Sequence, residues 1–216
     1  MKVARRRQRY HRGNVREDLL AEAHRVLAND SLEGLTVRGL TAAIGVTPAN
    51  FYNHFASLDA LLAVLARDGM VDLSGRVARI ERRARGPGKV IREVAKAYVR
   101  FADEQPQLYR LMFGHLVVRL RSFPEFADAA EAGFANLVRL VYGDDRYDRA
   151  DPMGSHARCP HAYAFFSLLN GLARDVIDGL VTLPTARDRD AFTEVIVGSF
   201  IAGDAYRELG KRFSAS

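Results

Sequence analysis

The side chains best suited to chemistry in this chain are short and polar, and they lie between residues 36 and 55. An asparagine amide can form paired hydrogen bonds with adenine, and a threonine or alanine methyl group can touch the methyl group of thymine. Short side chains also let a helix backbone come close to base edges. The residues of this kind are Thr47, Ala49, Asn50 and Asn53. Their pattern indicates DNA reading rather than catalysis.

Two short helices are needed to position these side chains. Thr36 is a suitable N-cap for the first, which we expect to end at a left-handed cap on Gly45. The second begins after Thr47, with Pro48 at a position where a missing N–H costs nothing. Two short helices joined by a glycine-containing turn are typical of the helix-turn-helix unit, whose second helix enters the major groove. Phe51 and Phe55 are expected to be core residues.

The rest of the chain is also patterned as helix, because apolar residues recur at three- and four-residue spacing and strand-like alternation is missing. We therefore predict an all-α fold, in which a three-helix N-terminal helix-turn-helix domain precedes a C-terminal helical bundle. A polar loop is expected over 143–155. The expected helices outside the helix-turn-helix unit cover residues 14–29, 58–65, 89–104, 108–113, 124–142, 161–180 and 187–209.

Glycine residues suggest where the two domains meet. Gly69, Gly75 and the Gly86-Pro87-Gly88 segment predict a linker region, since glycine is unfavourable inside a helix. The predicted division places an N-terminal arm and DNA-binding domain in residues 1–72 and a second helical domain in residues 73–216.

Positive charge is concentrated at the start of the chain, before the first acidic residue, Glu17. The formal net charge is +6, and seven of the 32 basic residues lie in the first sixteen positions. Such an arm cannot pack a core, and DNA phosphates would neutralise it with release of counterions. A solubilising tail is the alternative interpretation. Within the arm, Arg12 is a candidate DNA contact.

Composition limits the remaining possibilities. Hydrophobic residues make up 48% and charged residues 27%, as in ordinary globular proteins. No apolar run is long enough to cross a bilayer, and no apolar segment follows the basic residues, so we expect neither a membrane partner nor a secretory signal. A single cysteine, Cys159, cannot form an intramolecular disulfide, and a reducing cytoplasm is the simplest location.

Residues 14–65 resemble the TetR family of transcriptional regulators. The resemblance is carried by Leu35-Thr36-Val37-Arg38, Gly45-Val46-Thr47, Phe51-Tyr52-Asn53-His54-Phe55 and Leu61-Leu62. It implies that Thr36, Arg38, Thr47, Tyr52 and His54 contact DNA. Tyr52 and His54 would bind phosphates, while Arg38 and Asn50 are the better candidates for base contacts. Packing at a helix end is the alternative for Tyr52 and His54. Leu58 departs from the family, which usually has a lysine there.

The second half is similar to the C-terminal domain of the WHG type of TetR regulators, through Tyr98-Val99-Arg100-Phe101-Ala102, Gln105-Pro106 and the segment 108–113. Phe166 and Asn170-Gly171 stand where that group has Trp and His-Gly. The resemblance implies a homodimer on an inverted-repeat operator, with the last two helices forming a four-helix interface with their copies. The wide apolar faces of those helices favour the same conclusion. The expected interface residues are Phe165, Leu169, Leu172, Val176, Val195 and Phe200.

A pocket for a small-molecule effector would lie between helices of this domain, mostly apolar with a few polar groups. Core packing is the alternative for its aromatic residues. His115 and Asn170 stand out, because a polar residue on an apolar helix needs a partner. The candidate lining residues are Tyr98, Tyr109, Met112, Phe113, His115, Phe126, Phe134, Tyr163, Phe166 and Asn170.

We therefore expect a repressor that a small-molecule effector releases from a palindromic operator. A constitutive or architectural DNA-binding protein without an effector stays open. A metal or thiol sensor built on His156, Cys159 and His161 is also open, although no second cysteine completes a ligand set. An enzyme is not expected, because nucleophile elbow, phosphate loop and His-Glu metal motifs are missing. Neither a cofactor nor a metal ion is expected.

Overall fold

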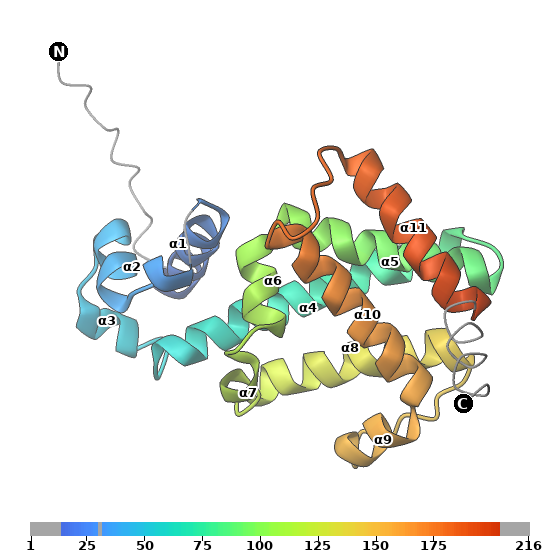
Figure 1. Cartoon of the computed structure of the whole chain (residues 1–216). Coiled ribbons are helices and arrows are strands. Elements are labelled where there is room, and N and C mark those ends of the chain that lie inside the picture. Colours follow the sequence, from blue (N-terminus) through green and yellow to red (C-terminus); the bar gives the residue numbers. More distant parts are fainter. Residues whose placement is uncertain (1–13, 30–31, 204–216) are drawn as a thin grey trace, which may run out of the picture.

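The computed structural model describes residues 14–29 and 32–203, and every regular element in these ranges is helical. Figure 1 shows a small N-terminal head, formed by α1 to α3, connected through the long helix α4 to a larger bundle. The predicted all-α fold is confirmed. Most of the basic arm, including Arg12, lies outside the described residues. Within the described ranges no helix is long and apolar enough to cross a membrane.

The head forms as its caps predict. Helix α1 spans Val15–Asn29, α2 spans Val37–Ile44 and α3 spans Pro48–Tyr52. Gly45 ends α2 with φ 75°, a left-handed conformation in which most other residues would be strained. The side chains at the centre of the head, Leu19, Leu40, Phe51 and Leu61, are buried. Short helices of this length are marginal alone, so this shared core stabilises them.

Helix α4 spans Leu58–Arg83, 26 residues without a break. The linker predicted at Gly69 and Gly75 is therefore wrong, since both glycines lie inside this helix. Gly69 allows a close approach, because a Cβ there would lie 2.5 Å from the Met112 sulfur of another helix. Tertiary packing outweighs the modest helix cost of a single glycine. Only Gly86, with φ 84°, lies at an actual break. The division at residue 72 stays a proposal, and α4 crosses it.

The bundle packs α5 against α4, α10 and α11, while α8 covers the other side of α4 (Figure 1). Gly143 ends α8 in a left-handed cap, as the predicted end of that helix requires. The helices of the bundle are α5 (Pro87–Glu104), α6 (Pro106–Phe113), α7 (Val117–Leu120), α8 (Pro124–Tyr142), α9 (Pro152–Arg158), α10 (Pro160–Ile177) and α11 (Ala186–Ala202).

Two stretches differ from the sequence prediction. The polar loop expected over 143–155 ends early, because Asp151 caps α9 by accepting a hydrogen bond from the Gly154 N–H at 3.0 Å. Ser155, expected in the loop, is buried on this helix and bonds the backbone of Asp148. Helix α10 ends at Ile177 rather than Leu180. The end expected for the last helix, Leu209, lies outside the described residues.

Candidate functional site

The turn between α2 and α3 presents two threonine hydroxyls near the surface. Thr36 Oγ1 accepts a hydrogen bond from the Gly39 N–H at 3.0 Å, and Thr47 Oγ1 accepts one from the Asn50 N–H at 3.4 Å. Both caps use the hydroxyl oxygen as acceptor, so each O–H remains able to donate. A phosphate oxygen is a suitable acceptor for such a donor. The cap and a DNA contact are therefore compatible roles for both residues.

The other predicted DNA contacts in the described residues lie on α2, on α3 and just after it. Arg38 is exposed and forms no ion pair with another described residue. Tyr52 is 59% exposed, and its ring packs edge-on against Phe51 at 5.4 Å. Its hydroxyl therefore extends from the core instead of packing into it. Of the remaining predicted contacts, Ala49, Asn53 and His54 are exposed and Asn50 is half-buried.

Two residues near α3 bear on contacts with the DNA backbone. The guanidinium of Arg16 lies 5.0 Å from the ring centre of Phe55, a cation–π contact that places this cation beside the end of α3. Leu58, where the family usually has a lysine, packs against the hydrophobic core at the start of α4. The head therefore has a fixed cation at Arg16 and an apolar side chain at Leu58.

A cavity of about 460 Å³ lies between helices α4 to α10 of the bundle, and it opens to solvent beside exposed lining residues such as Val118 and Met153. Its wall is mainly apolar, as is usual for small-molecule sites. A chain of neighbouring rings runs along one side, from Tyr98 through Phe113 and Phe166 to Phe134, with centroid separations of 5.6, 6.1 and 5.8 Å. The predicted pocket residues that line this cavity are Tyr98, Met112, Phe113, Phe134, Tyr163, Phe166 and Asn170.

Three predicted pocket residues do not line the cavity. His115 is exposed, since it follows the end of α6 at Gly114. Phe126 is fully buried in the hydrophobic core, so the core-packing alternative holds for it. Tyr109 lies behind the wall, where its hydroxyl donates to Asn170 Oδ1 at 2.7 Å. The sequence analysis missed lining residues from α4 and α9, such as Ser74 and His156, because only the tertiary fold brings those helices together.

A polar group lies at each end of the aromatic wall. At the first end are Tyr98, Tyr109, Asn170 and Arg174, and burial raises the pKa of both tyrosines well above their usual value. At the other end Arg121 pairs with Glu131 at 2.6 Å. Glu131 also accepts a hydrogen bond from the Tyr147 hydroxyl. His156 lies 3.4 Å from that hydroxyl, and burial lowers its pKa.

The residues of the alternative metal or thiol site have separate surroundings. Cys159 is fully buried beside Phe134 and Ala162, and the His161 ring lies 3.2 Å from the Tyr142 hydroxyl. Within the described ranges no group of three His, Cys, Asp or Glu residues is placed to hold a metal ion. The buried Cys159 also lacks the exposure that a reactive thiol needs.

The predicted dimer residues divide into two groups. Phe165, Leu169 and Leu172 are buried in the core of their own chain, so their apolar face already has an intramolecular partner. Phe200 stacks on Phe165 at 5.8 Å, and Val176 is half-buried. Only Val195 is largely exposed, at 69%. Periodicity could not separate a face that packs within the chain from one that packs against a partner.

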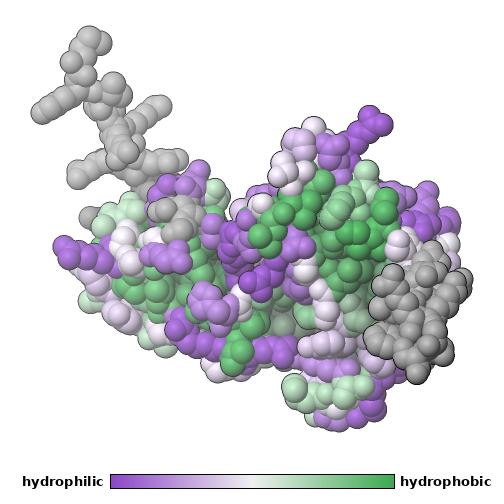
Figure 2. All heavy atoms as spheres, viewed as in Figure 1, coloured by the Kyte–Doolittle hydropathy of each residue, from purple (hydrophilic) through white to green (hydrophobic). Residues whose placement is uncertain are grey.

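An exposed apolar surface nevertheless remains on the last two helices. Figure 2 shows hydrophobic residues gathered over α10 and α11 on the viewed face. Large apolar side chains on or after these helices are exposed at Leu180, Val195 and Ile201. Gly171 and Gly198 have open space where a side chain would extend. Small residues beside exposed apolar ones would allow another helix to approach closely.

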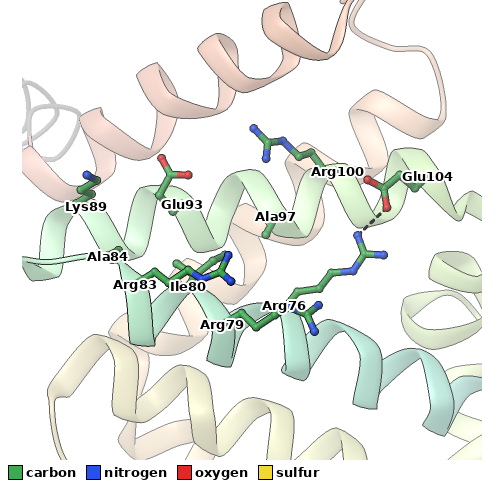
Figure 3. Close-up of a pocket in the computed structure, with 10 residues that line it drawn as sticks. All are labelled: Arg76, Arg79, Ile80, Arg83, Ala84, Lys89, Glu93, Ala97, Arg100 and Glu104. Atoms are coloured by element: carbon green, nitrogen blue, oxygen red, sulfur yellow. Dashed lines mark hydrogen bonds and ion pairs between the residues drawn. The ribbon is translucent and has the colours of Figure 1, made fainter.

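A second hollow, of about 490 Å³, is a groove between α4 and α5 with a basic lining (Figure 3). Two of its arginines are paired, Arg76 with Glu104 at 2.6 Å and Arg100 with Asp190. Arg79, Arg83 and Lys89 are exposed and form no ion pair with another described residue. Cations near the C-terminus of α4 also interact favourably with the helix dipole. This groove is more open than the cavity and is lined mainly by charged side chains, whereas the cavity lining is mainly apolar.

Solved structures with the same architecture are known. A protein of unknown function from Rhodococcus sp. RHA1 is 27% identical, with a TM-score of 0.72 and coverage of 91% of this chain and 98% of that one. A TetR-family transcriptional regulator from Bordetella parapertussis is 14% identical, with a TM-score of 0.55 and coverage of 87% and 94%. The second likeness, at so low an identity, concerns the fold alone.

Curated relatives match a shorter part of the chain. The nucleoid occlusion factor SlmA of Aliivibrio fischeri is 29% identical over 132 residues, 58% of this chain and 67% of that protein. The same factor in Actinobacillus pleuropneumoniae is 22% identical over 118 residues, 52% and 58% of the two chains. The uncharacterized HTH-type transcriptional regulator YobS of Bacillus subtilis is 28% identical over 97 residues, 45% and 50%. The chain thus spans about half to two-thirds of the length of these relatives.

Family profiles match both halves of the chain. One, described as bacterial regulatory proteins of the tetR family, covers residues 19–65, which include α2 and α3. The other, described as a tetracyclin repressor-like C-terminal domain, covers residues 91–200 and so includes much of the bundle. The chain therefore belongs to the TetR family of DNA-binding transcriptional regulators.

Proposed function

We propose that the protein is a homodimeric repressor that a small-molecule effector releases from a palindromic operator. In the free dimer, the two copies of α3 enter adjacent major grooves, and Asn50 and Arg38 contact bases. Thr36, Thr47, Tyr52 and His54 hold phosphates. Effector binding in the bundle cavity then changes the separation of the two heads. To shift this equilibrium, the effector must bind the two states with different affinity.

The observation that carries this proposal is that one helix belongs to both sites. The first turns of α4 pack into the core of the head through Leu61, Leu62 and Leu65. Further along the same helix, Met70, Leu73 and Val77 line the cavity. A ligand that displaces this wall must move a helix on which the head is built. Rigid helices of this kind can carry coupling between separate sites.

A second connection supports the same route. Arg119, just before the end of α7, forms an ion pair with Asp59 in the first turn of α4 at 2.9 Å. Its neighbours Val117 and Val118 line the cavity. Movement of α7 would therefore act directly on the start of α4, close to α3. Because both charged groups are partly exposed, the pair is worth less than about 1 kcal/mol and can break when the helices move.

The test is selection of tightly bound duplexes from a randomised DNA pool, at a salt concentration near physiological, with the full-length protein. We expect a single inverted repeat whose half-sites lie about one DNA turn apart. Recovery of unselected DNA, with affinity that collapses as salt rises, would contradict the operator proposal, because binding would then be mainly electrostatic.

A matched pair of variants tests the two contact roles. Asn50→Ala should weaken binding by about 1–3 kcal/mol at particular base pairs of the selected site. Tyr52→Phe removes only a hydroxyl and should weaken binding by similar factors on all operator sequences. Titrations of both variants against the selected site and its single-base substitutions separate these patterns. If the two patterns were exchanged, the assigned roles would be wrong.

A second candidate function is DNA binding without an effector. The relatives named nucleoid occlusion factors favour it, since that name describes a role other than ligand-controlled repression. The mainly apolar cavity beside α4 favours the effector-controlled repressor instead. Screening compounds for release of the selected duplex distinguishes the two, because a protein without an effector would release its DNA with none of them.

A further inference from the structure

The cavity contains one polar atom whose bonding is incomplete. Tyr98 Oη is the buried side-chain oxygen or nitrogen that finds no hydrogen-bond partner among the described residues. The residue is 7% exposed, and its side chain lines the cavity. Burial raises the pKa of this phenol, so the hydroxyl stays protonated and can donate. Buried polar groups are nearly always paired, and an orphan in a cavity wall indicates a missing acceptor.

The polar groups around this hydroxyl form hydrogen bonds with other groups. Tyr109, whose ring lies 5.9 Å from the Tyr98 ring, donates its own hydroxyl to Asn170 Oδ1 at 2.7 Å. The Asn170 amide in turn donates to the Phe166 carbonyl at 2.9 Å. These bonds hold the amide in place. Tyr109 Oη and Asn170 Oδ1 each keep a free lone pair, but neither meets Tyr98 Oη in hydrogen-bond geometry, so a molecule inside the cavity can supply the acceptor.

A cation without a partner lies at the same end. Arg174 follows Asn170 by one helical turn on α10, lines the cavity with an exposed side chain, and forms no ion pair with another described residue. Asp178, one turn further on, is already held by Arg110 at 2.5 Å. The Arg174 charge also acts on the Tyr109 hydroxyl, where it opposes the larger effect of burial on that pKa. Guanidinium groups favour planar anions such as carboxylates.

The opposite end of the cavity does not offer a second anion site. Arg121 there is neutralised by Glu131, which also accepts the Tyr147 hydroxyl. His156 adds no charge near neutral pH, because burial lowers its pKa. The rest of the wall is mainly aromatic and aliphatic, with side chains such as Phe113, Phe166 and Leu137, and its uncharged polar members include Ser74 and Asn136. One guanidinium and one hydroxyl donor at one end, followed by a mainly apolar wall, match a ligand that has a single negative charge and an apolar body.

We infer that the effector is an amphipathic monocarboxylic acid. Its carboxylate would bind Arg174 and accept the Tyr98 hydroxyl, and its apolar body would lie along the rings from Phe113 to Phe134. A polyphosphorylated ligand does not fit, because no other unpaired cation lines the described cavity. The inference rests on the proposed function, since it names the class of molecule that this cavity would sense.

The test measures binding of two acids and their neutral matches to the full-length protein without DNA. Decanoate is compared with decanamide, and 2-naphthoate with 2-naphthamide, by isothermal titration calorimetry. In the unmodified protein we expect at least one acid to bind about tenfold tighter than its amide, as a charge-assisted hydrogen bond would give. Equal binding of acid and amide in both pairs, or binding of neither acid, would overturn the inference.

Three variants assign the effect to residues. Arg174→Gln should remove the preference for the acid and leave amide binding unchanged. Tyr98→Phe should weaken acid and amide alike by several-fold, because both carry a carbonyl acceptor. Arg187→Gln removes an exposed charge at the start of α11, away from the cavity lining, and should change neither. The carboxylate site would be refuted if Arg174→Gln still preferred the acid over its amide. It would also be refuted if Arg187→Gln lost that preference to the same extent as Arg174→Gln.

Release of the selected duplex is measured separately, so the two proposals fail in different ways. If the acid binds through Arg174 but the protein stays on its DNA, the ligand class holds and effector-controlled release is wrong. If other compounds release the duplex while neither acid binds, regulation holds and the ligand class is wrong.

Discussion

The head and the bundle place their functional groups in opposite ways. In the head, the predicted contacts are exposed or half-buried side chains on short helices, fixed by caps that act within three residues. In the bundle, the distinctive groups line a cavity between helices and come from helices far apart in the sequence, as with Tyr98 on α5 and Asn170 on α10. A surface that reads DNA needs a rigid local frame, whereas a cavity that senses a ligand needs walls able to move.

The single helix α4 connects the head to the bundle, and its two halves have different surroundings. Its N-terminal half is surrounded by the head core, where Leu61, Ala63 and Leu65 are buried. Its second half has half-buried residues such as Ser74 and Val77 against the cavity. Under the proposed function, a change at the cavity would move the head as a unit, because the same helix belongs to both.

The largest effect is expected from the core of the head. Phe51→Ala removes a fully buried ring that contacts Tyr52 and Phe55. It should lower the free energy of unfolding by about 3–5 kcal/mol and abolish operator binding, because every DNA contact depends on this frame. Urea unfolding followed by circular dichroism gives the stability change. Phe51→Leu is the control and should retain binding. Unchanged operator affinity in Phe51→Ala would mean that the head is not rigid.

The second prediction concerns the exposed face of the bundle. Val195→Glu places a carboxylate on the outer side of α11, where the unsubstituted side chain is 69% exposed. If this face forms the dimer, the buried charge should cost about 3 kcal/mol of association and raise the dimer dissociation constant about a hundredfold. Sedimentation equilibrium measures it. Val71→Glu, on α4 with 60% exposure, should leave association unchanged. Equal behaviour of the two variants would place the interface elsewhere.

The sequence predicted the head well because its signals are local. Thr36, Gly45, and Thr47 with Pro48 each act on neighbours within a few residues, and the structure has all three caps where the sequence predicts them. The bounds of α8 follow equally from Pro124 and Gly143. Helix α9 carried a similar signal, Asp151 followed by Pro152, but its short length and polar surroundings suggested a loop.

The bundle was predicted less fully because its decisive contacts are distant in sequence. Nothing near Gly69 indicates that Met112 will pack against it and allow α4 to continue. Likewise, the apolar face containing Phe165 and Leu169 could not reveal that its partners lie in the same chain. Tyr98 and Asn170, two of the pocket residues predicted from the sequence, both line the cavity. The hydrogen bond from Tyr109 to Asn170 and the unpaired Tyr98 hydroxyl could be identified only from the fold.

A smaller effect is expected at the turn of the helix-turn-helix unit. Gly45 has φ 75°, and no atom lies within 4 Å of where its side chain would begin. Gly45→Val should therefore destabilise through backbone strain alone, by about 1–2 kcal/mol. Gly45→Asn should cost less, because asparagine tolerates the left-handed conformation. Urea midpoints of both variants test this order. Equal losses would indicate that steric contact, not backbone conformation, limits the turn.

The smallest expected effect is a pH dependence of the free energy of unfolding, and it arises at the cavity of the bundle. Burial lowers the pKa of His156 from its ordinary 6.5, with Glu131 opposing and Arg121 adding to the shift. The unfolded chain therefore binds this proton first, and His156 should reduce stability progressively as pH falls below 6.5 toward the lower folded pKa. Above pH 6.5 it should contribute no pH dependence. His156→Gln should lose this component, so the difference in urea midpoint between it and the unsubstituted protein should change from pH 7.5 to pH 5.

His24→Gln, exposed on α1, is the matched control. A constant difference across this range for His156→Gln would show that the imidazole is as accessible to protons in the folded bundle as in the unfolded chain.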